Sequence, residues 1–83
     1  FMLGSDRDEV VDFLFGKRML SRRIAREAYD LADDYRGVHG DPRTAWGIVS
    51  GLTRLSQKSA YADKRTQIDI AAGKILSKVI ETV

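Results

Sequence analysis

Apolar residues recur along this chain at helical spacing, and their pattern predicts four helices. The expected helices cover about residues 6–15, 22–36, 42–58, and a last segment from residue 62 or 63 to the C-terminus. Alternation of the kind that marks a β-strand is not sustained beyond a few residues. The sequence therefore predicts an all-α fold, a small helical bundle of about four helices.

Residues at the expected helix ends support these boundaries. Ser5 is placed to cap the first helix, and Gly37 is expected to end the second as its left-handed residue. Asp41 is the expected N-cap of the third helix, with Pro42 at its first position, where the missing N–H is not needed. Asp63 is the expected N-cap of the fourth helix.

The third predicted helix contains two interior glycines, Gly47 and Gly51. Each one costs about 1 kcal/mol relative to alanine, and a spacing of four places both on one face of the helix. Such a bare strip is useful where another backbone approaches closely, and the small-residue face at 71–73 of the last helix is the expected partner. The predicted helix-docking residues are Trp46, Gly47, Gly51, Ala72 and Gly73.

Length and composition indicate one globular unit. The chain has 83 residues, of which 43% are hydrophobic and 31% are charged. It has no cysteine, which excludes a disulfide framework and a thiolate metal site, and no apolar run approaches the roughly 18 residues that span a bilayer. We expect a single helical domain over 1–83. Because Phe1 precedes Met2, the alternative that the chain is the C-terminal fragment of a longer protein stays open.

A basic cluster precedes and opens the second predicted helix. Five residues lie within ten positions: Lys17, Arg18, Arg22, Arg23 and Arg26. One interpretation is nucleic-acid binding through Arg18, Arg22, Arg23 and Arg26, because arginines spaced by helical turns can contact successive phosphates. The other is a solvated face or pairing with a second subunit. Acidic residues follow on the same helix, so the charge order opposes the helix dipole and favours partners for both ends.

The sequence offers little for catalysis. His39 is the only histidine, and it lies beside Asp41 in a loop rich in glycine, without a neighbouring nucleophile. No spacing of acidic residues matches a metal site, and no phosphate-binding loop, dinucleotide fingerprint or zinc pattern is present. We therefore expect no enzyme, no catalytic residues, no cofactor and no metal.

The second half of the chain resembles a known family. The TAWG element at 44–47, the GLT element at 51–53 and the AAGK element at 71–74 resemble the C-terminal part of a phage- and plasmid-related protein family of unknown function. The likeness runs from about Gly37 onward, whereas residues 54–57 depart from the aromatic- and histidine-containing stretch that family members carry there. The resemblance implies a cytoplasmic bacterial protein of a mobile element, usually longer than this chain, and it implies no reaction.

These observations favour a non-catalytic helical interaction or oligomerisation module. Its expected partner is another copy or the remainder of a parent protein, and no membrane partner is expected. The core of so short a chain scarcely offsets its ordering entropy. The aromatic residues Phe13, Phe15, Trp46 and Tyr61, with the apolar C-terminal end, exceed what one short bundle buries easily. The alternative is a nucleic-acid-binding module used in mobile-element replication or recombination.

Overall fold

The computed structural model describes residues 2–16 and 20–82, apart from the side chains of His39 and Thr82. The described residues form helices and no strand, so the predicted all-α fold with four main helices is confirmed. The only pairing of the strand type among them is an isolated bridge between Met2 and Thr44. The helices are α1 (Arg7–Gly16), α2 (Arg22–Asp34), α3 (Arg36–His39), α4 (Ala45–Ser56), the 3-10 helix η1 (Ser59–Lys64) and α5 (Arg65–Thr82).

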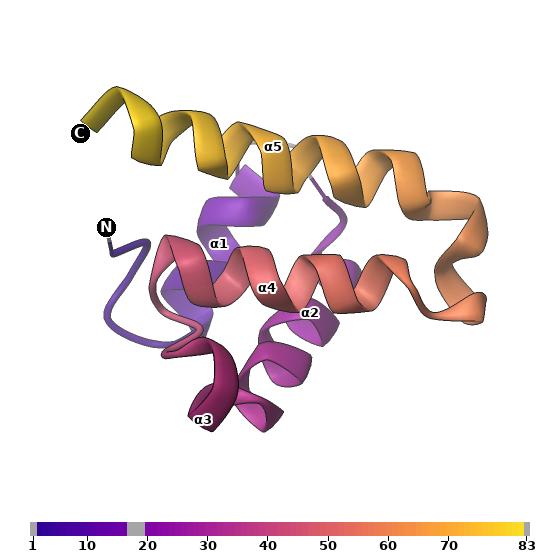
Figure 1. Cartoon of the computed structure of the whole chain (residues 1–83), viewed down its shortest axis with the longest axis horizontal. Helices are drawn as coiled ribbons and strands as arrows, with labels where there is room; N and C mark the ends of the chain where they lie inside the picture. The colour runs from indigo at the N-terminus through magenta and orange to yellow at the C-terminus, as the bar shows by residue number, and fades with distance from the viewer. Residues whose placement is uncertain (1, 17–19, 83) are drawn as a thin grey trace.

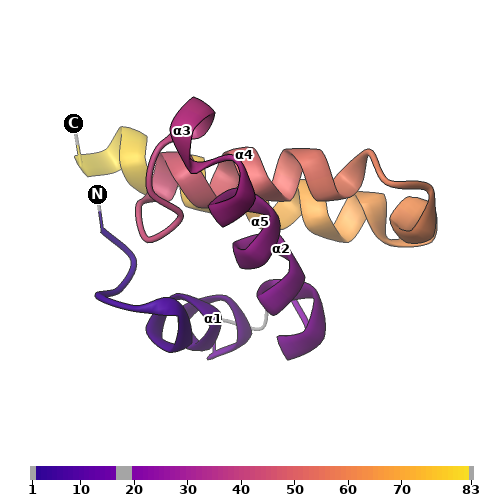
Figure 2. The same cartoon turned by 90° about the horizontal axis from the view of Figure 1, so that it is seen from below.

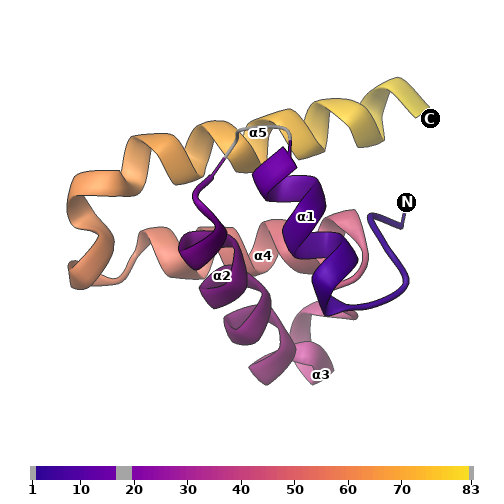
Figure 3. The same cartoon turned by 180° about the vertical axis from the view of Figure 1, so that it is seen from behind.

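Helix α4 is the centre of the molecule. Helix α5 runs antiparallel beside it, joined to it through η1, and forms one outer edge of the fold (Figure 1). Helix α2 crosses α4 on the side away from α5, with α1 packed against α2 (Figures 2 and 3). The two described ends of the chain lie at the same end of the molecule.

One continuous hydrophobic core holds these helices together. Leu14 of α1, Ile24 of α2 and Ile75 of α5 form one buried cluster with Ile48 and Leu52 of α4. Burial of a side chain of this size contributes about 1.5–3 kcal/mol relative to exposure. The apolar stripe of the third predicted helix therefore does face the core, as its spacing indicates.

Two of the aromatic residues expected in surplus differ in burial. Phe15 is about half exposed at 47%, as that expectation indicates. Its ring lies 4.9 Å from the guanidinium carbon of Arg22, which favours a cation–π contact at the surface. Tyr61, expected among the surplus apolar side chains, is buried.

The close approach expected at the glycine pair is present, but its partner was wrongly predicted. A Cβ atom on Gly51 would lie 2.7 Å from the carbonyl oxygen of Ala28 and 2.6 Å from the Cβ of Ala32, both in α2. A Cβ on Gly47 would lie 2.1 Å from the carbonyl oxygen of Asp41. Gly73 of α5, the expected partner, is exposed and a Cβ there would meet nothing within 4 Å. The alanines of α2 match Gly51, and the turn before α4 fills the space beside Gly47.

The turn before α4 also differs from the prediction. Thr44, rather than Asp41, caps the helix, because its Oγ1 accepts the backbone N–H of Gly47 at 3.1 Å. The same hydroxyl donates to the carbonyl oxygen of Asp41 at 2.6 Å. Pro42 is buried within the turn and lies before the first helical residue. Asp41 was the right residue type for a cap, but it stabilises the turn and Thr44 stabilises the helix.

Arg43 fixes the Asp41 side chain in this turn. The carboxylate accepts the backbone N–H of Arg43 at 2.9 Å and the guanidinium Nε–H at 3.0 Å. Hydrogen bonds from the Arg43 side chain, and then from its backbone, lower the pKa of Asp41 to about 2. The turn is thus held by a charged carboxylate, and it sets the starting direction of α4.

The remaining boundaries move by one to three residues. Asp6 caps α1 by accepting the N–H of Glu9 at 2.9 Å, and Ser5, the expected cap, donates its own N–H to the Glu9 carboxylate at 3.1 Å. Gly37 lies inside α3 and does not end α2, and the left-handed glycine is Gly40, with φ of 88°. Asp63 lies inside η1 and does not cap α5.

We predict that Gly51→Ala destabilises the fold by about 1–3 kcal/mol, although alanine is the better helix former, because its methyl group would overlap α2. Gly73→Ala is the matched control and should stabilise the chain by about 1 kcal/mol, since open space surrounds that position. Urea unfolding of dilute protein, followed by circular dichroism, measures both. A gain in stability for Gly51→Ala would show that α2 does not approach α4 so closely.

We predict that Asp41→Asn lowers the free energy of unfolding at neutral pH and that this loss disappears in acid. The pKa of Asp41 falls from 3.8 to about 2 on folding, so its stabilising charge is fully effective above about pH 4 and lost as the pH falls through about 2. In an Arg43→Gln background the same substitution should cost less. Urea titrations between pH 2 and 7 test this, and a pH-independent difference would contradict it.

Candidate interaction surface

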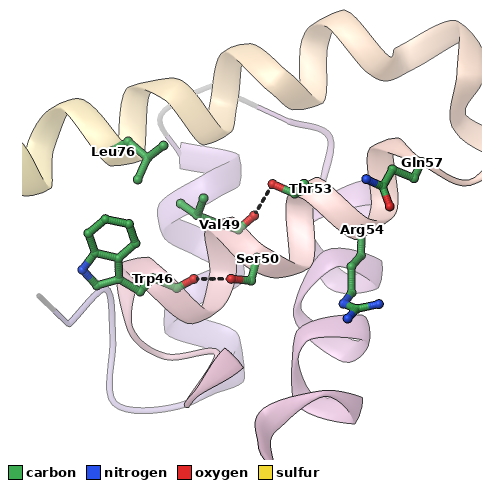
Figure 4. A pocket seen from close by; sticks show the side chains of 7 residues that line it. All are labelled: Trp46, Val49, Ser50, Thr53, Arg54, Gln57 and Leu76. Atoms are coloured by element: carbon green, nitrogen blue, oxygen red, sulfur yellow. Dashed lines mark hydrogen bonds between the residues drawn. The ribbon is translucent and has the colours of Figure 1, made fainter. Parts of the chain in front are cut away.

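The main hollow near the predicted docking residues is an open groove between α4 and α5, with a volume of about 380 Å³. We call it the Trp46 groove. Figure 4 shows the side chains that line it, which come from α4, from the residue that follows α4 and from α5. They are Trp46, Val49, Ser50, Thr53, Arg54, Gln57 and Leu76.

Trp46 lies outside the core because of its place in the helix. Ala45 and Ile48 point into the core, and Trp46 follows Ala45 by one residue, which turns it by about 100° on the helix. Its side chain is 59% exposed and faces Leu76 of α5 across the groove (Figure 4). The largest side chain of the chain is therefore presented to solvent beside a second apolar residue.

The hydroxyl groups in the groove are directed back to their own helix. Ser50 Oγ donates to the carbonyl oxygen of Trp46 at 3.0 Å, and Thr53 Oγ1 donates to that of Val49 at 3.0 Å (Figure 4). These bonds occupy the donors of both hydroxyls and leave their methyl and methylene groups toward the groove. The wall between Trp46 and Thr53 is consequently more apolar than its composition indicates.

The far end of the groove is tied to α2. The guanidinium carbon of Arg54 lies 3.9 Å from the centre of the Tyr35 ring, a close cation–π contact. Tyr35 is the residue that ends α2, so this contact joins α2 to the exposed side of α4. The pairing was not predicted from the sequence, because the two residues are 19 positions apart (54 − 35) and neither belongs to a motif.

The two predicted docking residues of α5 lie on different sides of that helix. Ala72 is buried against the core, whereas Gly73 faces solvent. Ile70, which was not singled out from the sequence, is 54% exposed on the same outer side as Gly73. Ile80, part of the apolar C-terminal end expected in surplus, is 72% exposed on that side. Helical register is the signal that could have identified Ile70.

The predicted basic cluster is not a uniform phosphate-binding face. Arg18 lies outside the described residues. Arg22 turns toward α1, where its guanidinium lies 2.7 Å from the Asp12 carboxylate and over the Phe15 ring. Arg22 therefore joins α1 to α2, and its charge is partly neutralised there.

Arg23 and Arg26 are the described members that extend into solvent. The Arg23 side chain is 85% exposed, with Nε 3.5 Å from the Glu27 carboxylate. The Tyr61 hydroxyl donates to the same carboxylate. Arg23 also lines a hollow with Lys64 and Asp63 of η1. We call the exposed Arg23, Arg26 and Lys64 the basic patch; the carboxylates of Glu27 and Asp63 lie beside it and partly neutralise it.

The acidic end of α2 finds partners within the chain. Asp30 lies 3.1 Å from the Arg7 guanidinium of α1, and Asp33 lies 2.8 Å from that of Arg36 in α3. Such exposed pairs contribute at most about 1 kcal/mol each. From the sequence, the unfavourable charge order of α2 favours a partner in a second subunit, whereas in the structure neighbouring helices of the same chain balance it.

The pKa shifts of Tyr29, Asp41 and Arg43 all move the pKa further from neutral pH. Burial raises the pKa of the Tyr29 hydroxyl, with the charges of Asp33 and Asp41 adding to the rise, and the bond with Asp41 raises the pKa of Arg43.

No group of three or more metal-ligating residues occurs in the part of the chain that the structure describes. No described helix is long and apolar enough to cross a membrane. The side chain of His39, the single histidine of the sequence, lies outside the described residues.

Comparison with known proteins gives no match: no family model, no curated protein and no solved structure is similar to this chain.

Proposed function

We propose that this chain is a non-catalytic helical interaction module that self-associates through the surface formed by the Trp46 groove and the outer side of α5. The observation that carries the proposal is the exposure of Trp46 beside Leu76, where α4 and α5 meet at the surface. Tryptophan at the centre of a surface is the residue type that most often dominates binding energy.

The apolar surface extends beyond the groove. Leu76 lies on the same side of α5 as Ile80, one turn further along, so Trp46, Leu76 and Ile80 follow one another across the two helices. Met2, also exposed, pairs with Thr44 at the start of α4 and adds to the same end of the molecule. Single exposed apolar side chains are ordinary, but a contiguous group of this kind is typical of an interaction site.

Self-association would also compensate for the small hydrophobic core of so short a chain. A domain of this length buries a smaller share of its surface than a larger one does, and burial in a dimer adds apolar contact without lengthening the chain. The resemblance to phage- and plasmid-related proteins supports the same proposal only as context, namely a module within a larger mobile-element protein.

We predict that sedimentation velocity shows concentration-dependent association over about 1–100 μM, and that Trp46→Ser weakens it by ~10-fold or more. Stability of the monomer should change little, because the ring is 59% exposed. Val38→Ser is the matched control, since Val38 is 71% exposed on α3, on the other side of α4 from α5 (Figures 1 and 3). A monomer across the whole range would exclude the proposed function.

A second proposal is nucleic-acid binding through the basic patch of Arg23, Arg26 and Lys64, supported by the exposure of Arg23 and its shared hollow with Lys64. We expect Arg23→Ala with Arg26→Ala to weaken binding of a labelled oligonucleotide. The salt slope should fall by roughly one unit for each phosphate that the protein no longer neutralises. Arg36→Ala is the control, because Arg36 lies in α3, beyond the end of α2 opposite to Arg23. No binding at low salt would remove this proposal.

A further inference from the structure

Helix α5 has an unusual solvent face. Its buried side is formed by Ile68, Ala71, Ile75 and Val79, which pack into the core. The centre of the opposite side, which we call the outer seam, is formed by Thr66, Ile70, Gly73, Ser77 and Ile80. None of these residues is charged, although the centre of a solvent face is where a surface helix normally places its charges. The charged residues of α5 lie on the two flanks of the seam.

The outer seam has the spacing of a helix–helix contact. Its residues follow one another at intervals of four, three, four and three, the repeat that keeps one stripe facing a partner helix. Large residues, Ile70 and Ile80, stand on either side of two small ones, Gly73 and Ser77. The isoleucines are more than half exposed in the single chain, so the stripe has no partner within the described fold.

Gly73 favours a partner from outside the chain, because no close contact within the described fold requires a glycine at this position. Gly47 and Gly51 are each in contact with another backbone, so their helical cost has a structural reason. A Cβ on Gly73 would meet nothing within 4 Å, although the residue lies inside the longest helix. The bare position is therefore available for the close approach of a helix from outside.

We propose that a second copy of this chain packs its α5 against this one in parallel register, so that each residue of the outer seam meets its own equivalent. This inference rests on the proposed self-association and specifies how the α5 part of that surface pairs, beside the Trp46 groove. The two Ile70 side chains would pack together at one end of the contact and the two Ile80 side chains at the other. Between them, the small residues Gly73 and Ser77 would let the two helix backbones approach closely. Because α5 forms an outer edge of the fold, the two cores would lie on opposite sides of the helix pair (Figure 1).

Charge complementarity selects the second copy and the parallel direction. In a parallel helix pair, the residue that precedes a seam position lies close to the partner residue five positions further along. Asp69 precedes the seam residue Ile70, so it would lie close to Lys74 of the second copy. Two-fold symmetry makes this pair twice. In an antiparallel pair Lys74 would instead face Lys74 of the other copy, and the like charges would repel each other. Neither Asp69 nor Lys74 has an ion pair among the described residues.

The first test removes the seam without disturbing the core. Ile70→Glu combined with Ile80→Glu should weaken association ~100-fold or more, because it places like charges opposite each other in a parallel pair. Helix content and monomer stability should be kept, since both side chains are exposed. Val38→Glu makes the same kind of change on α3 and should leave association unchanged. Association that survives the double substitution would overturn the seam, although the proposed function would stand.

The second test determines the direction of pairing. The chain has no cysteine, so Ser77→Cys introduces a single thiol. In the parallel register two such thiols lie across the seam, and mild oxidation should give a covalent dimer, since a disulfide needs Cα atoms within about 7 Å. Ser59→Cys, exposed in η1, is the control: it should associate as the native chain does but give no covalent dimer on oxidation. Cross-linking only between Ile70→Cys and Ile80→Cys chains would show an antiparallel pair and overturn the proposed register.

The third test exchanges the flanking charges. Asp69→Lys should weaken association, because it sets two lysines against each other in the parallel register. Adding Lys74→Asp should restore it, since the opposite pair is re-formed with its signs reversed. If the native chain stays monomeric in sedimentation, the proposed function itself is excluded. If the chain associates and the charge exchange does not change its association, only the parallel seam is excluded.

Discussion

The close packing of α4 against α2 and against the turn before it is the constraint on which the other features depend. Gly51 admits the backbone of α2, and Gly47 admits the carbonyl group of Asp41. With those two sides of α4 occupied, its apolar stripe lies between α1, α2 and α5, and Trp46 is turned to the open side. An additional methyl group at either glycine would displace a main-chain atom, which a packed interior accommodates poorly.

This arrangement separates the small residues of the chain by function. The alanines of α2 and Gly51 of α4 hold two crossing helices together inside the molecule, and Gly47 holds the turn before α4. Gly73 has the same chemistry but lies at the surface, between exposed isoleucines, where an added Cβ would meet nothing within 4 Å. The contrast matters because a helical glycine is unfavourable wherever it occurs. The internal glycines have a visible partner, and the proposed dimer supplies one for the third.

Charge is used differently on the two sides of the molecule. Around α2, Arg22 pairs with Asp12 and Asp30 pairs with Arg7, so much of the charge is balanced between neighbouring helices. On α5, the outer seam is uncharged, and its flanks carry Asp69 and Lys74 without partners among the described residues. The ion pairs around α2 hold the helices of one chain together, whereas the flanking charges of α5 are available to set the direction in which two chains pair.

The sequence by itself determined the helical class, the approximate extent of the four main helices and the need for a close contact at Gly47 and Gly51. These properties follow from local spacing and from the cost of glycine in a helix. Only the tertiary structure decided which element fills the glycine strip, because small residues of α2 and of α5 are equally suited to it by type. The cap residues also depended on it: Asp41 and Thr44 can each cap a helix, and the buried Pro42 and the Arg43 bond assign Asp41 to the turn. Spacing shows which residues share a face, but the partner of that face is set by the packing of the whole chain.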